Sequence, residues 1–187
     1  MRVQALSERG VRRLRLAVHL VTRFVGALSP VPPAAGDEAW VAAVLGEHSA
    51  THHLWATMSA PDRRHAIGVA RRVDDACGGA GPDELAAALL HDVGKVVAGF
   101  GTLARVPATL AGLGGGRQLA TAWSTRPAGL RRRVGDYLIH DLAGARLLRD
   151  AGAPALAAAW AEEHHRPEAT WTVPIDVGRR LKGADDD

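Results

Sequence analysis

Apolar residues recur along the chain three or four positions apart, which is the spacing of one helix face, and no segment alternates convincingly as a strand would. The pattern therefore predicts an all-α protein. We expect helices at about 11–28, 37–57, 60–77, 117–123, 128–150, 154–165 and 174–184, and a further one that begins near Pro82 and carries the sequence LAAALLHD. A glycine-rich stretch at 94–116 interrupts the helical pattern.

Capping residues mark two of the helix starts. Ser59 precedes Pro61 and Asp62, which supplies a serine cap, a first-turn proline and an acidic residue at the positive end of the helix dipole. Pro82 is likewise followed by two acidic residues. Both helices are therefore expected to begin at these positions.

The helix after Pro82 has an unusual end. Its apolar run, ELAAALL, indicates a helix directed into a core, yet His91 and Asp92 follow immediately. Burying one unpaired polar group costs roughly 1–3 kcal/mol, and burying a charge costs more. We therefore expect these two side chains to have partners in the folded protein.

Composition fits one soluble domain, with 187 residues of which 47% are hydrophobic and 23% charged. The net charge is only +3, and a nucleic-acid footprint needs basic residues clustered on one face, so we expect no nucleic-acid partner. Cys77 is the single cysteine, which excludes an intrachain disulfide and favours a cytoplasmic location.

The N-terminal segment LRLAVHLVTRFVGALSPVPPAA loosely imitates a signal peptide. Arg15, His19 and Arg23 interrupt its apolar stretch at four-residue spacing, so they share one face of an amphipathic helix. A membrane span needs about 20 mostly apolar residues. We expect a helix that packs on the rest of the protein and no membrane partner; a membrane-surface helix and a signal are the alternatives.

The histidines fall into two sets. Four lie on polar stretches where nothing favours metal binding: His19, His48, His52 and His53. Five lie within or at the end of apolar helices: His65, His91, His140, His164 and His165. Four helices that each direct histidine toward an apolar interior predict a shared metal site, because metal binding compensates buried imidazoles and carboxylates.

Spacing within the helices supports convergence at one site. Lys95 follows His91 by four positions and shares its face if the helix continues that far. Gly144 follows His140 by four positions, which leaves room beside the histidine for another backbone or a ligand. Gly68, three positions after His65, is a candidate for the same role.

The order of these motifs along the chain is His65, HDVGK at 91–95, His140 in HDLAG, EEHH at 162–165, and Asp185 in LKGADDD. This order resembles the HD-domain superfamily of metal-dependent phosphohydrolases over about residues 60–187. The resemblance implies a single all-helical bundle with a metal site in its centre. We accordingly expect residues 59–187 to form an HD-type metal-binding domain and residues 1–58 to form N-terminal helices packed on it.

The resemblance also implies a first metal bound by His65, His91, Asp92 and Asp185. Asp186 and Asp187 are the alternatives to Asp185 in register. No Gly-Tyr-Pro follows EEHHRPEATW, so the branch with that motif is not expected.

Three further residues are assigned by the same resemblance. His140 and His164 resemble the extra ligands of the two-metal branch, in which Asp92 bridges the metals, and His165 either replaces His164 or lies beside the substrate. Lys95 resembles the family lysine that neutralises the substrate phosphate. Asp141 forms a second His-Asp pair but is not read as the motif, because Gly-Ala follows where Gly-Lys is expected.

Imidazoles and carboxylates without thiolates favour one or two divalent ions of Fe, Mn, Co or Zn. Such ions lower the pKa of a bound water and hold phosphate oxygens, while Lys95 opposes the developing charge. The expected function is a metal-dependent phosphohydrolase acting on a nucleotide or other small phosphate ester, with Lys95 and Asp92 as catalytic residues. The alternatives are a di-iron oxygenase of the same superfamily and a non-catalytic, metal-bearing regulatory domain.

Overall fold

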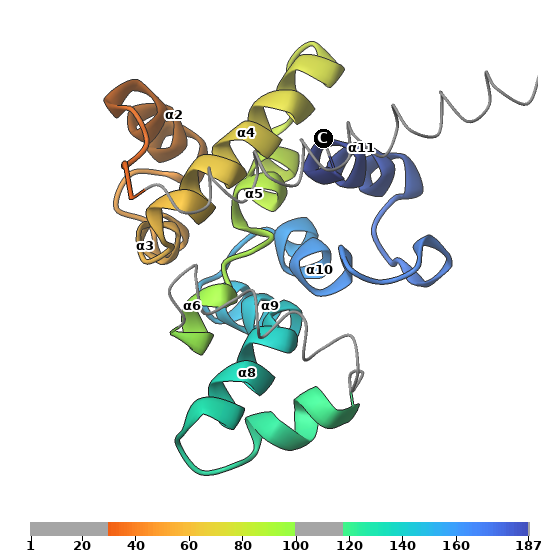
Figure 1. Cartoon of the computed structure of the whole chain (residues 1–187). Helices are drawn as coiled ribbons and strands as arrows, with labels where there is room; N and C mark the ends of the chain where they lie inside the picture. The colour runs from red at the N-terminus through yellow and green to blue at the C-terminus, as the bar shows by residue number, and fades with distance from the viewer. Residues whose placement is uncertain (1–29, 100–117, 187) are drawn as a thin grey trace, which may run out of the picture.

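The computed structural model describes residues 30–99 and 118–186, so the helix expected at 11–28 lies outside the described residues. The described part of the chain is an all-α bundle, as the apolar periodicity predicts (Figure 1). Its helices are α2 (Ala35–Leu45), α3 (Ala50–Ala56), α4 (Ala60–Cys77), α5 (Pro82–Leu90), α6 (Lys95–Ala98), α8 (Leu130–Leu138), α9 (His140–Asp150), α10 (Ala155–Glu163) and α11 (Ile175–Asp186). Residues 118–124 are also helical, and a 3-10 turn spans Glu168–Thr170.

The α5 helix is the buried centre of the bundle. Every residue from Leu85 to Leu90 is at most 8% exposed, as expected of a helix that is apolar on all sides. Its alanines let α2, α4, α10 and α11 all contact it (Figure 1). The residues that follow α5 therefore emerge in the middle of the molecule.

The capping residues before α4 and α5 mark the observed starts. The Ser59 hydroxyl oxygen accepts a hydrogen bond from the backbone N–H of Asp62, and α4 ends at Cys77, as predicted. Pro82 is the first residue of α5, as its sequence context predicts.

The single helix predicted at 37–57 is wrong, because this region contains α2 and α3. The break spans Gly46 to Ser49 and has two residues with positive φ, Gly46 at 81° and His48 at 64°. Ser49 then caps α3 by accepting a hydrogen bond from the backbone N–H of His52 at 3.0 Å.

The single helix predicted at 128–150 is also divided. Ile139, with φ −116° and ψ 26°, separates α8 from α9 and places His140 at the junction. Gly135 of α8 packs against the helical residues 118–124, where an added Cβ would lie 2.4 Å from the backbone nitrogen of Ser124. This close crossing fixes α8 just before the junction.

A glycine pair brings α9 against the turn that follows α5. A Cβ on Gly94 would lie 1.9 Å from the carbonyl oxygen of His140, and one on Gly144 would lie 3.0 Å from the nitrogen of Gly94. Gly144 therefore leaves room for another backbone, which is one of its two predicted roles. Gly68 does not have this role, because a Cβ there would meet only the Arg72 side chain, at 3.4 Å.

The segment between α10 and α11 is held by buried polar contacts. Both carboxylate oxygens of Glu163 accept hydrogen bonds from Thr172, one from the backbone N–H at 2.7 Å and one from the hydroxyl at 2.6 Å. The neighbouring Trp171 packs so closely on Gly178 of α11 that a Cβ there would lie 2.7 Å from its ring. These contacts fix α11 relative to α10.

Within residues 30–99 and 118–186, none of the helices combines the length and apolarity needed to cross a bilayer.

Candidate metal centre

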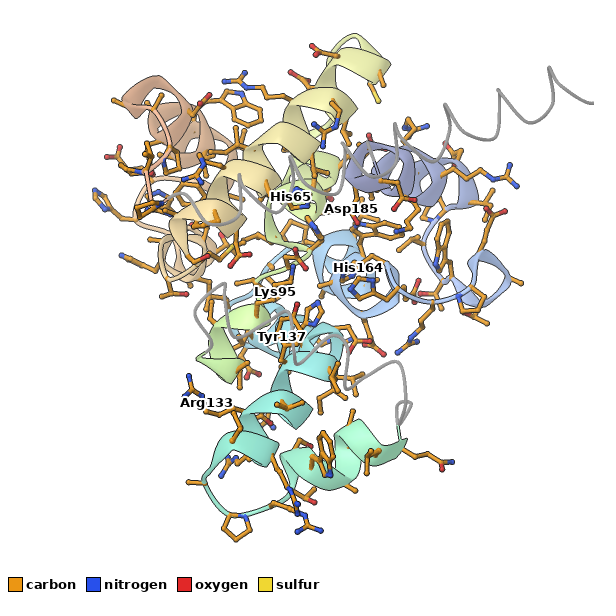
Figure 2. All side chains as sticks on the ribbon, in the orientation of Figure 1. His65, Lys95, Arg133, Tyr137, His164 and Asp185 are labelled. Atoms are coloured by element: carbon orange, nitrogen blue, oxygen red, sulfur yellow. The ribbon has the colours of Figure 1, made fainter. Side chains whose placement is uncertain are left out.

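Seven of the residues predicted to bind metal lie in two adjoining groups. One group contains Asp92, His140, His164 and His165, and the other contains His65, His91 and Asp185. Within each group, the nitrogen and oxygen atoms available for binding lie within 4.8 Å of one another. The groups draw on α4, the end of α5, the start of α9, the end of α10 and α11. Figure 2 shows His65, His164 and Asp185 gathered in the middle of the molecule.

Three of the histidines are held by the same kind of hydrogen bond, to a backbone carbonyl at a helix end. A helix leaves the carbonyls of its last turn without partners, and a histidine at the helix end can donate to them. The Nδ1–H of His91 donates to Ala88 at the end of α5 at 2.9 Å, and that of His140 donates to Tyr137 at the end of α8 at 2.7 Å. Because a carbonyl oxygen can only accept, the proton of each neutral ring is on Nδ1.

His164 repeats this arrangement at the end of α10. Its Nδ1 lies 3.1 Å from the carbonyl oxygen of Ala161 and 3.2 Å from that of Trp160. The Nε2 atoms of His91 and His164 are buried and have no hydrogen-bond partner among the described residues. In its neutral form each ring therefore presents an unprotonated Nε2 to the interior, which is the form that binds metal.

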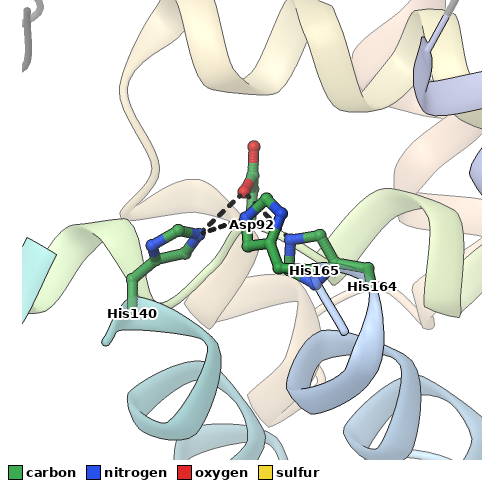
Figure 3. Close-up of side chains that lie close together, drawn as sticks. All are labelled: Asp92, His140, His164 and His165. Carbon is green, nitrogen blue, oxygen red and sulfur yellow. Dashed lines mark hydrogen bonds and ion pairs between the residues drawn. The ribbon is translucent and has the colours of Figure 1, made fainter. Parts of the chain in front are cut away.

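Asp92 lies between the two groups. Its Oδ1 faces Nε2 of His140 at 3.4 Å and Nε2 of His164 at 3.8 Å, while its Oδ2 faces Nε2 of His91 at 3.4 Å. Figure 3 shows the carboxylate directed toward the histidines of α9 and α10. One carboxylate thus supplies an oxygen atom to each group.

His164 and His165 both belong to the group around Asp92. His165 is the more exposed of the two, and its Nε2 lies 3.4 Å from Nε2 of His140. In Figure 3 the two rings come from neighbouring positions at the end of α10 and lie on the same side of Asp92. The structure therefore brings both sequence alternatives into one group.

Asp185 is the acidic residue of the C-terminal run that reaches the site. Its Oδ1 lies 3.0 Å from Nε2 of His65 and 3.6 Å from Nε2 of His91. Asp186 instead pairs with Lys182 at 2.8 Å, and Asp187 lies outside the described residues.

Lys95 reaches the site from the turn that follows α5. The α5 helix ends at Leu90, so Lys95 does not share a helix face with His91. A turn spans residues 91–94, and Lys95 then begins α6, with its ammonium donating to Oδ2 of Asp92. The shared face was expected only if the helix continued to Lys95; it does not, yet the turn still places Lys95 beside the His-Asp pair.

At Asp92 and Asp185, neighbouring charges and hydrogen bonds together outweigh the effect of burial on the pKa. Burial alone would raise the pKa of Asp92, yet the positive charges of Lys95 and His91 hold it well below its usual range. Burial would also raise the pKa of Asp185, but the hydrogen bond from His65 and the charge of His91 keep it low. Both carboxylates are therefore ionised at neutral pH.

The pKa values of His91, His164 and His165 in the site shift in different directions. Burial lowers the pKa of His164, and loss of water around the partly exposed His165, together with His164 and His140, lowers its pKa to about 3. Burial acts in the same direction on His91, but there Asp92 and Asp185 outweigh it and raise the pKa. A proton on Nε2 of His91 occupies the same place between two carboxylates that a metal cation would take.

Two neighbours of the site have no counterpart in the sequence interpretation. The backbone carbonyl of Tyr137 accepts the hydrogen bond from Nδ1–H of His140, and the Tyr137 ring stacks on the His140 ring, with centroids 5.8 Å apart. Asp62, 8% exposed on α4, is near enough for its charge to act on the Lys95 ammonium. Its position three residues before His65, on the same helix face, is the signal that could have identified it.

The donor set fits a divalent transition metal. The two groups offer imidazole nitrogens and carboxylate oxygens without a thiolate, and two buried imidazole nitrogens have no partner among the described residues. His48, His52 and His53 belong to neither group. For the described histidines these observations agree with the division made from the sequence; His19 lies outside the described residues.

The comparisons with known proteins identify the family. The family model for the HD domain matches residues 63–186, which is more than half of the chain. No curated protein and no solved structure shows a match to this chain. The matched region contains every residue of the two groups, so the chain belongs to the HD domain family, whose members are mostly metal-dependent phosphohydrolases.

Proposed function

We propose that this protein is a metal-dependent phosphohydrolase that cleaves a nucleotide or another small phosphate ester with a metal-activated water. The observation that carries the proposal is Asp92, whose two carboxylate oxygens face different histidine groups while Lys95 lies beside it. Two adjoining groups that share one carboxylate are suited to a pair of metal ions.

The proposed ligands follow the two groups. His65, His91 and Asp185 would hold one ion and His140, His164 and His165 the other, with Asp92 contributing an oxygen atom to each. Divalent Fe, Mn, Co and Zn are the candidates for this mixture of nitrogen and oxygen donors. When bound, such ions supply Lewis acidity, which lowers the pKa of a bound water and polarises the phosphoryl group.

The protein's own residues prepare the site for an anionic substrate. Backbone carbonyls fix the three helix-end histidines in one tautomer, so their rings are oriented before metal or substrate arrives. Lys95 supplies a positive charge beside Asp92, where it would oppose the charge that develops on phosphoryl oxygens during cleavage. No side-chain nucleophile is required, because water is the attacking group.

The test combines metal analysis with a substrate screen. Protein stripped by chelation would be reloaded separately with Mn²⁺, Co²⁺, Fe²⁺ and Zn²⁺ and assayed for phosphate release from nucleotides, dinucleotides and simple phosphate esters. We expect about two ions per chain and phosphate release that depends on the metal. The matched control is His53→Ala, which removes a histidine outside both groups.

Two results would reject the proposal. Oxygen consumption by the Fe²⁺ form without phosphate release from any substrate would favour the oxygenase alternative. Stable metal binding without either activity would favour a regulatory domain.

A further inference from the structure

Lys95 binds Oδ2 of Asp92, and the proposed first metal would bind the same oxygen. The Lys95 ammonium donates to Oδ2 of Asp92, and this oxygen also faces Nε2 of His91 at 3.4 Å. A divalent ion bound between Asp92 and His91 would lie only a few ångströms from the ammonium. Two cations so close together in a largely buried site repel strongly, because little water is present to screen them.

Asp62 is a second carboxylate whose charge acts on the Lys95 ammonium. It lies in the first turn of α4, one turn before His65, and is 8% exposed. One of its oxygens, Oδ2, accepts a hydrogen bond from the Ser59 hydroxyl at 2.5 Å, which fixes the side chain against the start of the helix. A carboxylate fixed in this way offers Lys95 a second position near the site.

We infer that Asp62 is a positioning residue that receives the Lys95 ammonium when a metal takes Oδ2 of Asp92. Lys95 then remains beside the metal site, bound to a carboxylate that binds no metal, and its charge stays available for a phosphoryl oxygen. The inference rests on the proposed metal site and explains how one carboxylate serves both a lysine and a metal. Metal loading and the position of Lys95 are thereby coupled.

The test is a double-mutant cycle read by metal affinity. Co²⁺ would be titrated by calorimetry into chelator-stripped wild type, Asp62→Asn, Lys95→Met and the double variant. We expect Asp62→Asn to weaken binding at the first-metal site roughly tenfold in the wild-type background, because Lys95 then stays on Asp92. In the Lys95→Met background the same substitution should change the affinity less than twofold, because no ammonium needs a second position.

Simple charge loss predicts a different result. If Asp62 only attracts cations at a distance, Asp62→Asn weakens Co²⁺ binding at least as much when Lys95 is absent, and this outcome would overturn the inference. An unchanged affinity in both backgrounds would overturn it as well. The failure of wild type to bind Co²⁺ at all would instead reject the proposed metal site.

A matched control removes a similar charge elsewhere. Asp83 lies in the first turn of α5 and is exposed, so Asp83→Asn deletes an acidic residue at a helix start outside both metal groups. It should leave Co²⁺ affinity unchanged. Thermal melts of every variant confirm that the folded fraction is the same before each titration.

Discussion

Asp92 is the residue that both histidine groups share, and removing its charge should therefore affect both. We expect Asp92→Asn to lose bound metal and phosphate release together, because an amide is a poor ligand for either ion and supplies no negative charge. Metal content by elemental analysis and the phosphate assay measure the two losses. His52→Ala should change neither quantity, and full metal content in Asp92→Asn would show that Asp92 does not bridge the groups.

Lys95 allows catalysis to be separated from folding. If its ammonium opposes phosphoryl charge, Lys95→Met should keep the fold and the metal yet slow turnover about 10²–10³-fold, which corresponds to roughly 3–4 kcal/mol. Lys95→Arg should restore only part of the rate, because a planar guanidinium does not reproduce a compact ammonium. Steady-state kinetics on metal-matched proteins are the measurement, and wild-type turnover in Lys95→Met would remove this residue from the catalytic set.

His164 should make the metal-free protein sensitive to acid. Burial lowers its pKa in the folded state, whereas the unfolded chain takes up the proton near pH 6.5. Because the unfolded state then binds more protons, the His164 contribution to stability falls as the pH drops below about 6.5.

The variant His164→Asn isolates this effect, since it keeps a donor for the helix carbonyls and cannot titrate. Urea unfolding of both chelated proteins at pH 7 and pH 5 measures the difference. We expect acidification to destabilise wild type more than the variant. An equal loss of stability in the two proteins would contradict the lowered pKa of His164.

At the scale of elements, the site depends on how closely α9 approaches the turn after α5. Gly94→Ala would place a methyl group 1.9 Å from the carbonyl oxygen of His140, and backbone cannot move aside cheaply. We expect a loss of about 1–3 kcal/mol in the free energy of unfolding, together with weaker metal binding, because the two elements would separate. Denaturant unfolding and a Co²⁺ titration measure these effects.

Gly68→Ala is the matched control on α4. Its added methyl group would meet only the flexible Arg72 side chain, at 3.4 Å, and alanine is the better helix former by about 1 kcal/mol. We expect unchanged or slightly increased stability. Equal destabilisation by both substitutions would show that the close approach at Gly94 is not what matters.

At the scale of the whole molecule, the two groups join helices that are far apart in sequence. His65 is on α4 and Asp185 is near the end of α11, so an ion held by both connects the start of the matched region to its end. A ligand that binds only the folded state stabilises it by mass action. Chelation should therefore lower the melting temperature.

For one ion at a hundred times its dissociation constant, the stabilisation is about 2.7 kcal/mol, or roughly 5–10 °C for a chain of this size. Thermal melts with and without chelator, followed by readdition of metal, measure it. An unchanged melting curve after confirmed metal removal would contradict a site that links the helices.

Local patterns in the sequence were sufficient for the helical class and for several boundaries. Ser59 and Pro82 define the starts of α4 and α5 because capping depends only on neighbouring residues. The order of the His and Asp motifs was sufficient to indicate the family, since that order is independent of how the helices pack. The roles of the individual ligands remain predictions.

Tertiary structure decided what the periodicity of the chain could not. The break at Ile139 and the turn that carries Lys95 depend on contacts with other elements, above all the Gly94–Gly144 approach. The sequence left Asp185, Asp186 and Asp187 open, and the packing of α11 on α4 and α5 brings Asp185 to His65.

The position of Asp62 near Lys95 also follows from packing, because the two residues belong to different helices. Helical spacing determines which side chains share a face, so shared faces can be predicted from the amino-acid sequence alone. Which faces meet depends on the free energy of burying them together, and only the folded chain determines that.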